Sequence, residues 1–184
     1  MTLSTHLLET RFGWVGLAWN ELGVRRLFLQ ERERGSVERR LAGLGAEATP
    51  CPAPSGWVAG VIDGIKRYFD GENVDFDTVP VDLSGVGDFR LSIYAAAKAL
   101  RYGETTTYGE LALRGGHPGL ARETGQALGS NPVPLIIACH RILAAGGKIG
   151  GFSAPGGSTT KERMLRFEGV HVGPPPVAQH SFGF

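Results

Sequence analysis

Cysteine is scarce in this sequence: its 184 residues include only two, Cys51 and Cys139, and they form no Cys-x-x-Cys pair. Two cysteines in a chain of this length cannot form the framework of a disulfide-rich secreted domain. The five histidines are scattered and include no pair at the spacing of zinc ligands. The sequence therefore predicts no structural disulfide, no metal site and no cofactor.

Long apolar runs are also missing. No window approaches the ~20 apolar residues that span a bilayer, and the opening MTLSTHLLETRFGW lacks a basic segment followed by an apolar core. We therefore expect a soluble protein that is not exported, has no membrane partner and works in the reducing cytoplasm. The formal net charge is only +1, which neither favours nor excludes a nucleic-acid partner, because a local basic patch is what counts.

The first half of the chain combines strand and helix patterns. Short runs rich in β-formers alternate with glycine and asparagine turns over residues 5–30, which predicts three short antiparallel strands. Apolar residues at helical spacing predict a helix over residues 31–44 and another over 57–69, separated by a loop rich in proline. A further strand is expected over residues 74–83.

The second half is mostly helical. Residues 88–101 are good helix formers, and Thr107 and Glu110 have the spacing of a capping box at the start of the next helix. A Gly-containing turn then leads to a helix in GLARETGQALGS, residues 119–130, and this pair fits a helix-turn-helix. A plain helical hairpin in a core fits the same pattern.

A last helix is expected over residues 159–169, before a tail that contains GPPP. The fold class predicted is therefore α+β. We expect an N-terminal β/α domain over residues 1–84, a helical domain over 85–170 and a C-terminal tail over 171–184.

One motif points to chemistry. The stretch NPVPLIIACHRIL places Cys139 at the end of an apolar run, directly before His140 and Arg141. A thiol in apolar surroundings keeps a high pKa and is inert unless a base takes its proton. His140 can do this through a bridging water, and Glu168 can orient the imidazole, as in other nucleophile, base and orienter arrangements. A buried structural cysteine beside a capping histidine, or a Cys-His-Glu hydrolase, has the same spacing.

Five motifs, in order, resemble the catalytic domain of the O6-alkylguanine-DNA alkyltransferases, also called methylated-DNA–protein-cysteine methyltransferases: YGETTTYGELA, ARETG, NPVPLIIACHRIL, GGFS and KERMLRFEG. The N-terminal pattern is similar to that family's small ribonuclease-H-like domain. The resemblance implies direct-reversal DNA repair, in which a cysteine irreversibly accepts the alkyl group from O6 of a flipped-out guanine, with O4 of thymine as a further possibility. It also implies a monomer that enters the minor groove of double-stranded DNA with a helix-turn-helix.

The resemblance assigns the chemistry to particular residues. Cys139 matches the alkyl acceptor, while His140, through water, and Glu168 match the groups that remove its proton. Asn131 matches the hinge asparagine of the family. Tyr108 matches the tyrosine whose hydroxyl meets the guanine and the 3′ phosphate.

The resemblance also assigns the DNA contacts and the base pocket. Arg122 matches the arginine that fills the space left by the flipped base. The small residues Ala121, Gly125 and Ser130 belong to the helix that lies in the minor groove. The pocket that receives the base is lined by Cys139, Ile142, Phe152 and Ser153.

The sequence departs from the family pattern at three places. Ala138 stands where the family has proline, Phe152 stands for a tyrosine, and Ala154 and Pro155 lengthen the next loop. These changes predict a different substrate scope and an unchanged reaction type. The rival interpretations are a lesion-binding sensor, whose known class lacks the cysteine, and a helix-turn-helix regulator in which Cys139 senses alkylation or oxidation.

Overall fold

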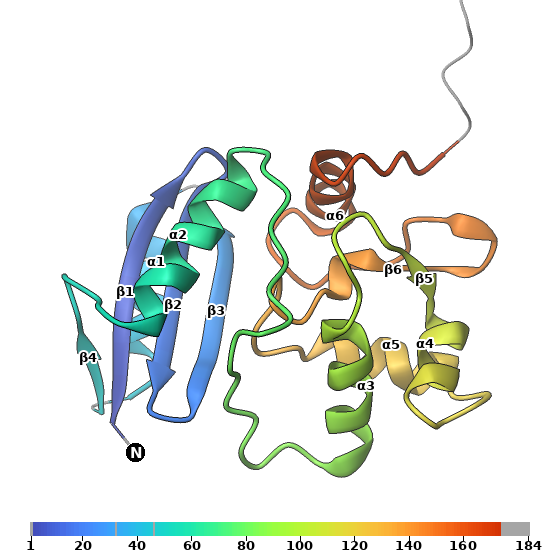
Figure 1. Ribbon diagram of the computed structural model, residues 1–184, viewed down its shortest axis with the longest axis horizontal. Helices are drawn as coiled ribbons and strands as arrows, with labels where there is room; N and C mark the ends of the chain where they lie inside the picture. The colour runs from blue at the N-terminus through green and yellow to red at the C-terminus, as the bar shows by residue number, and fades with distance from the viewer. Residues whose placement is uncertain (1, 32, 46, 174–184) are drawn as a thin grey trace, which may run out of the picture.

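The computed structural model describes residues 2–31, 33–45 and 47–173, and these form a four-stranded sheet followed by a helical half (Figure 1). The three predicted antiparallel strands are confirmed as β1 (Leu3–Thr10), β2 (Gly13–Asn20) and β3 (Gly23–Glu31). A short strand β4 (Ala48–Pro50) pairs parallel to β1, so the sheet order is β3-β2-β1-β4. The sequence predicted a loop at β4.

Two helices cover opposite faces of this sheet. Side chains alternate between faces along a strand, and β2 is buried on both. Ala18 packs with Val37 and Leu41 of α1 (Arg34–Ala42) on one face. Val15 and Leu17 pack with α2 (Trp57–Phe69), on the other face. At Gly16 a Cβ would lie 2.5 Å from Val37, so α1 can approach β2 this closely only over a glycine.

The predicted strand over residues 74–83 is wrong. Only Val81 makes an isolated bridge, to Val24 of β3. Pro80 has no N–H for a ladder, although its carbonyl accepts from the Val24 amide at 2.9 Å. Phe76 is buried in the core, and this segment crosses from α2 to the second half as an irregular connection with a turn after Phe76.

The second half has the predicted helices, with shifted ends. Thr107 and Glu110 form the expected capping box at the start of α4. A two-stranded parallel sheet and two 3₁₀ turns, η1 and η2, accompany the helices. The elements are α3 (Asp88–Lys98), β5 (Thr106–Thr107), α4 (Tyr108–Arg114), α5 (Ala121–Gly129), η1 (Cys139–Arg141), β6 (Ile142–Leu143), η2 (Ala145–Gly147) and α6 (Gly157–Phe167).

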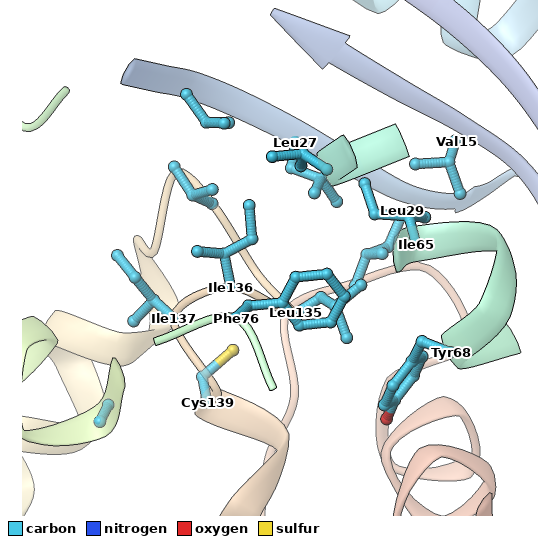
Figure 2. Close-up of a cluster of buried hydrophobic side chains, with 14 of the residues drawn as sticks. Val15, Leu27, Leu29, Ile65, Tyr68, Phe76, Leu135, Ile136, Ile137 and Cys139 are labelled. Atoms are coloured by element: carbon cyan, nitrogen blue, oxygen red, sulfur yellow. The ribbon is translucent and has the colours of Figure 1, made fainter. Parts of the chain in front are cut away.

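The two halves share one hydrophobic core. Figure 2 shows Leu27 and Leu29 of β3 facing Leu135 and Ile136 of the segment before η1, and all four are buried. The amide of Leu27 also donates to the carbonyl of Pro132 at 3.0 Å, so this segment binds to the free edge of β3.

The α+β class is confirmed, and the division near residue 85 stays a prediction. The expected tail begins inside the described chain, but residues 174–184 lie outside it. Within the described residues, no helix has both the length and the apolar character needed to cross a membrane.

Candidate active site

Cys139 lies at the first position of η1, at the end of a tightly held segment. Asn131 fixes the start of this segment: its side-chain oxygen accepts from the Val133 amide at 2.9 Å, and its amide group donates to the Ile137 carbonyl at 2.8 Å. Leu135 has φ +76°, the only positive value at a non-glycine residue among those described. Such strained backbone tends to occur at functional sites, and here it precedes a buried thiol.

The thiol sits in apolar surroundings that oppose its ionisation. Figure 2 shows Cys139 beside Ile137 and Leu135. Burial raises the pKa of Cys139, while a hydrogen bond from Asn131 and the positive charge of Lys161 act in the opposite direction. These two groups therefore favour the thiolate, which is the reactive form and which the surrounding apolar side chains disfavour.

His140 and Glu168 form a wholly buried pair. Nε2 of His140 lies 2.7 Å from Oε1 of Glu168, and both side chains have no exposed surface. Burial alone would raise the pKa of Glu168, but hydrogen bonds and charges from His140 and Arg141 hold it at about 2. The carboxylate is therefore ionised, so Nε2 carries the proton that joins them.

The other nitrogen of the His140 ring is then a free base. Burial lowers the pKa of His140, so the imidazole is neutral at neutral pH. Nδ1 is buried and has no hydrogen-bond partner among the described residues. A buried acceptor without a partner is costly, and this nitrogen is suited to receive a proton through a water molecule.

Arg141 completes the charge balance of Glu168. Its Nε donates to Oε2 at 2.8 Å and its Nη2 to Oε1 at 3.1 Å, the bidentate geometry that arginine forms with carboxylates. Its Nη1 donates to the Leu100 carbonyl at 2.5 Å. This ion pair joins the 3₁₀ turn that contains Cys139 to the residue that follows α6.

Two further residues at this site were not singled out from the sequence. Lys161 of α6 is fully buried; its ammonium donates to the carbonyls of Ile142 and, at 3.3 Å, Gly151, and burial lowers its pKa to about 8. Tyr68 of α2 donates its hydroxyl to Oε1 of Glu168 at 2.8 Å. Lys161 stands in the matched motif KERMLRFEG, whereas Tyr68 lies in the other half of the chain, where no local signal marks it.

The residues expected to line the base pocket lie around the same segment. Tyr108 begins α4 and its hydroxyl lies 3.4 Å from the Gly151 carbonyl. Ile142 is buried, Phe152 is half-buried and Ser153 is exposed. Ser153 also lines a cavity of about 310 Å³, together with the inserted residues of its loop and with residues of β3 and of the Asn131 segment.

The residues expected to contact DNA gather on α5. Arg122 is exposed in the first turn of α5 and forms no salt bridge within the described part of the chain. A Cβ on Gly125 would lie 3.7 Å from the Tyr108 ring, which places α5 against Tyr108 of α4. Ala121 and Gly125 are half-buried, and Ser130, the residue after α5, is exposed.

These features define an α+β protein with a buried free cysteine, followed in the sequence by a histidine that is held by a buried carboxylate. Residues 88–170 match the family model described as the DNA binding domain of 6-O-methylguanine DNA methyltransferase. A methylated-DNA–protein-cysteine methyltransferase of Mycolicibacterium paratuberculosis is 37% identical over 126 residues, covering 65% of this chain and 74% of that protein. The corresponding protein of Methanothermobacter thermautotrophicus is 32% identical and covers 86% of this chain and 81% of its own. The chain belongs to the methylated-DNA–protein-cysteine methyltransferase family.

Solved structures agree with this assignment. The Mycobacterium tuberculosis protein OGT, in a crystal structure with DNA, superposes with a TM-score of 0.72 at 33% identity, covering 90% of this chain and 92% of that one. An O6-methylguanine-DNA methyltransferase from Pyrococcus kodakaraensis superposes with a TM-score of 0.67 at 22% identity, which supports the fold.

Proposed function

We propose that this protein repairs alkylated DNA by moving the alkyl group from O6 of guanine, and by extension O4 of thymine, to Sγ of Cys139. A sulfur–carbon bond forms as the carbon–oxygen bond breaks, and the bonding electron pair stays on the base. The thioether is stable, so each protein molecule acts once. The observation that carries the proposal is the buried Cys139 thiol beside a histidine whose free Nδ1 is backed by an ionised carboxylate.

The proton of the thiol leaves through His140. A water between Sγ and Nδ1 passes it to the imidazole, and Glu168 stabilises the imidazolium that forms, the arrangement used by other activated nucleophiles. Lys161 adds a positive charge that favours the thiolate. The proton finally returns to the departing base, which leaves neutral.

The base is held by the walls around the thiol. The resemblance assigns the carbonyls of Cys139 and Ile142 to the exocyclic amine of guanine and Ser153 to O6, with Phe152 as an apolar wall. Both carbonyls already accept one bond, from the Ile142 amide and the Lys161 ammonium respectively. A carbonyl oxygen has two lone pairs, so each keeps one for the amine.

Double-stranded DNA is the partner, approached from the minor groove by α4 and α5 acting as a helix-turn-helix. Ala121, Gly125 and Ser130 allow close contact with the groove because they are small. Arg122 occupies the space of the flipped base, where its planar guanidinium can stack and hydrogen-bond. Tyr108 contacts the guanine and the adjacent phosphate.

The N-terminal half serves as a ribonuclease-H-like scaffold for this site, and the protein acts as a monomer. We place it in the cytoplasm, where Cys139 stays reduced.

The test is the mass of the intact protein after incubation with a duplex that carries one O6-methylguanine. Wild type and the control Cys51→Ala should each gain a single methyl group and consume an equal amount of lesion, whereas Cys139→Ala should gain none. If the protein binds the duplex tightly while the lesion persists, it is a lesion sensor. Release of several product molecules per protein would instead establish a hydrolase.

A further inference from the structure

We infer that Tyr68 is a positioning residue of the alkyl transfer: it reaches from the N-terminal half to hold the Glu168 carboxylate, and through it His140, in the arrangement that accepts the thiol proton. The inference rests on the proposed role of Cys139. Tyr68 lies near the end of α2, is fully buried, and donates its hydroxyl to Oε1 of Glu168 at 2.8 Å. Figure 2 shows its hydroxyl oxygen directed away from α2.

The Tyr68 hydroxyl donates to the same Glu168 oxygen that accepts from His140. Oε1 of Glu168 accepts from Nε2 of His140 at 2.7 Å, from Arg141 at 3.1 Å and from Tyr68, whereas Oε2 accepts from Arg141 and from the Gly103 amide. Of these donors, only Tyr68 comes from the sheet-bearing half. The tyrosine therefore couples that half of the chain to the oxygen that orients the base.

The direction of this hydrogen bond also favours one tautomer of His140. The tyrosine oxygen lies 3.4 Å from Nε2. Because its proton is committed to Glu168, it presents a lone pair to Nε2, which suits a protonated Nε2 and leaves Nδ1 bare. In the imidazolium, Nε2 then has two acceptors beside it, the carboxylate and the tyrosine oxygen. Loss of the hydroxyl removes one of them and makes His140 a weaker base.

Packing alone does not account for a tyrosine here. The Tyr68 ring lies 5.2 Å from Phe69 and 6.2 Å from Phe76, and both contacts are edge-to-face. A phenylalanine would keep these contacts and would bury no polar group, and burying a hydroxyl is costly unless it is hydrogen-bonded. The hydroxyl is thus retained for its contact with Glu168.

A matched control exists beside it. Tyr102 is a neighbouring tyrosine, 6.2 Å from the Tyr68 ring, and its hydroxyl donates at 2.5 Å to the backbone carbonyl of Phe167, one residue before Glu168. Removing either hydroxyl loses one hydrogen bond in the same region, but only Tyr68 touches the carboxylate. The charged and titratable groups that face the His140–Glu168 pair are Tyr68, Tyr102, Cys139, Arg141 and Lys161.

The experiment measures single-turnover transfer from O6-methylguanine duplex by wild type, Tyr68→Phe and Tyr102→Phe across about pH 5.5 to 9.5. Tyr68→Phe should transfer about fivefold more slowly below the midpoint of the pH profile, the size expected for one lost hydrogen bond. Its midpoint should rise by about 0.7 pH unit, which is the same fivefold change, and its rate at high pH should reach that of wild type. High pH restores the rate because solvent then removes the thiol proton directly.

Thiolate absorbance near 240 nm, measured without DNA, should show the same rise in midpoint for Tyr68→Phe and none for Tyr102→Phe. A Tyr68→Phe profile that superimposes on wild type, or that is lowered equally at every pH, overturns the inference. If wild type itself transfers no methyl group, the proposed function has failed and not this inference alone.

A measurement on the unaltered protein tests the same point if Tyr68→Phe does not fold. Nitrogen-15 NMR of ring-labelled histidine should show His140 protonated at Nε2 and bare at Nδ1. A proton on Nδ1 overturns the inference, because Tyr68 would then have to donate to Nε2 instead of to Glu168.

Discussion

Replacement of Glu168 by glutamine tests the charge balance on which the whole site depends. The Glu168 carboxylate accepts from His140, Arg141, Tyr68 and the Gly103 amide, and all of these contacts are buried or half-buried. Glutamine keeps one oxygen but presents an NH₂ group where the second stood. That group faces donors only, and Arg141 loses its counter-ion.

The expected loss follows from the pKa of the carboxylate. Lowering the pKa of Glu168 from 4.5 to about 2 corresponds to about 3 kcal/mol of folding free energy. Removing one partner of a buried ion pair typically costs ~3–5 kcal/mol, because the other charge is left uncompensated. Glu168→Gln should therefore lower the free energy of unfolding by about 3 kcal/mol at pH 7.

The pH dependence has a definite sign. The folded-state pKa of Glu168 lies below its unfolded value, so its contribution is fully present above pH 4.5 and is lost as the pH falls toward 2. The difference between wild type and Glu168→Gln should therefore be constant from pH 7 to about 5 and shrink steadily below that.

Urea unfolding at fixed pH values checks this, with Glu104→Gln as the control. Glu104 pairs with Arg114 at 2.8 Å, but this pair is exposed, so its loss should cost no more than about 1 kcal/mol. Equal destabilisation by the two variants at pH 7, or a Glu168→Gln difference as large at pH 3 as at pH 7, would refute the reasoning.

Three further substitutions separate the remaining parts of the site. Lys161→Met should slow methyl transfer at pH 7 by about fivefold and raise the thiol midpoint, because a nearby positive charge that favours the Cys139 thiolate is lost; thiolate absorbance against pH measures this. Arg122→Ala should slow transfer from duplex DNA by about tenfold or more but leave transfer from a free O6-alkylguanine base unchanged, because only the duplex requires base extrusion. Single-turnover rates on the duplex and on the free base, measured for both proteins, check this. Deleting Ala154 and Pro155 should change the ratio of rates on methyl and bulkier adducts, and an unchanged ratio would remove this loop as a determinant of scope.

Local signals predicted that the helices exist, and they predicted the bounds where a turn or a capping box marks an end. Helix α2 begins and ends at the predicted residues, where apolar residues at helical spacing run up to the Asp70–Gly71 turn. The spacing of Thr107 and Glu110 alone predicted the capping box at the start of α4. These elements depend on contacts within a few residues.

Pairing between segments that are far apart in the sequence could not be predicted from local patterns. Strand β4 forms in a proline-containing stretch because backbone groups of β1 are available at the sheet edge, including the Thr5 carbonyl that accepts from the Cys51 amide at 2.7 Å. The β-formers of residues 74–83, by contrast, reach the edge of β3 only at Val81, which bridges Val24, and they bury Phe76 in the core. Tertiary context decided both cases.

Part of the candidate site could likewise be predicted from local sequence, and part of it depends on contacts between distant segments. The order of Cys139 and His140 suggested a nucleophile and a base, and the structure brings Glu168 to the imidazole as that hypothesis required. Their roles in the reaction stay predictions. Spacing could not single out Lys161 or Tyr68. Lys161 contacts backbone carbonyls and Tyr68 contacts the Glu168 carboxylate, and both contacts form only in the folded chain.

The N-terminal half therefore does more than cover one side of the catalytic half. The edge of β3 binds the segment before the thiol through the Leu27 amide and the Pro132 carbonyl, and α2 binds the carboxylate behind the imidazole through Tyr68. One contact holds the segment that leads to Cys139, and the other holds the carboxylate that hydrogen-bonds His140. Because both contacts come from the N-terminal half, a shift of that half against the rest of the chain would act on the segment before Cys139 and on Glu168 at the same time. On the proposed reaction, the geometry of proton transfer therefore depends on how the two halves pack as well as on the residues next to Cys139.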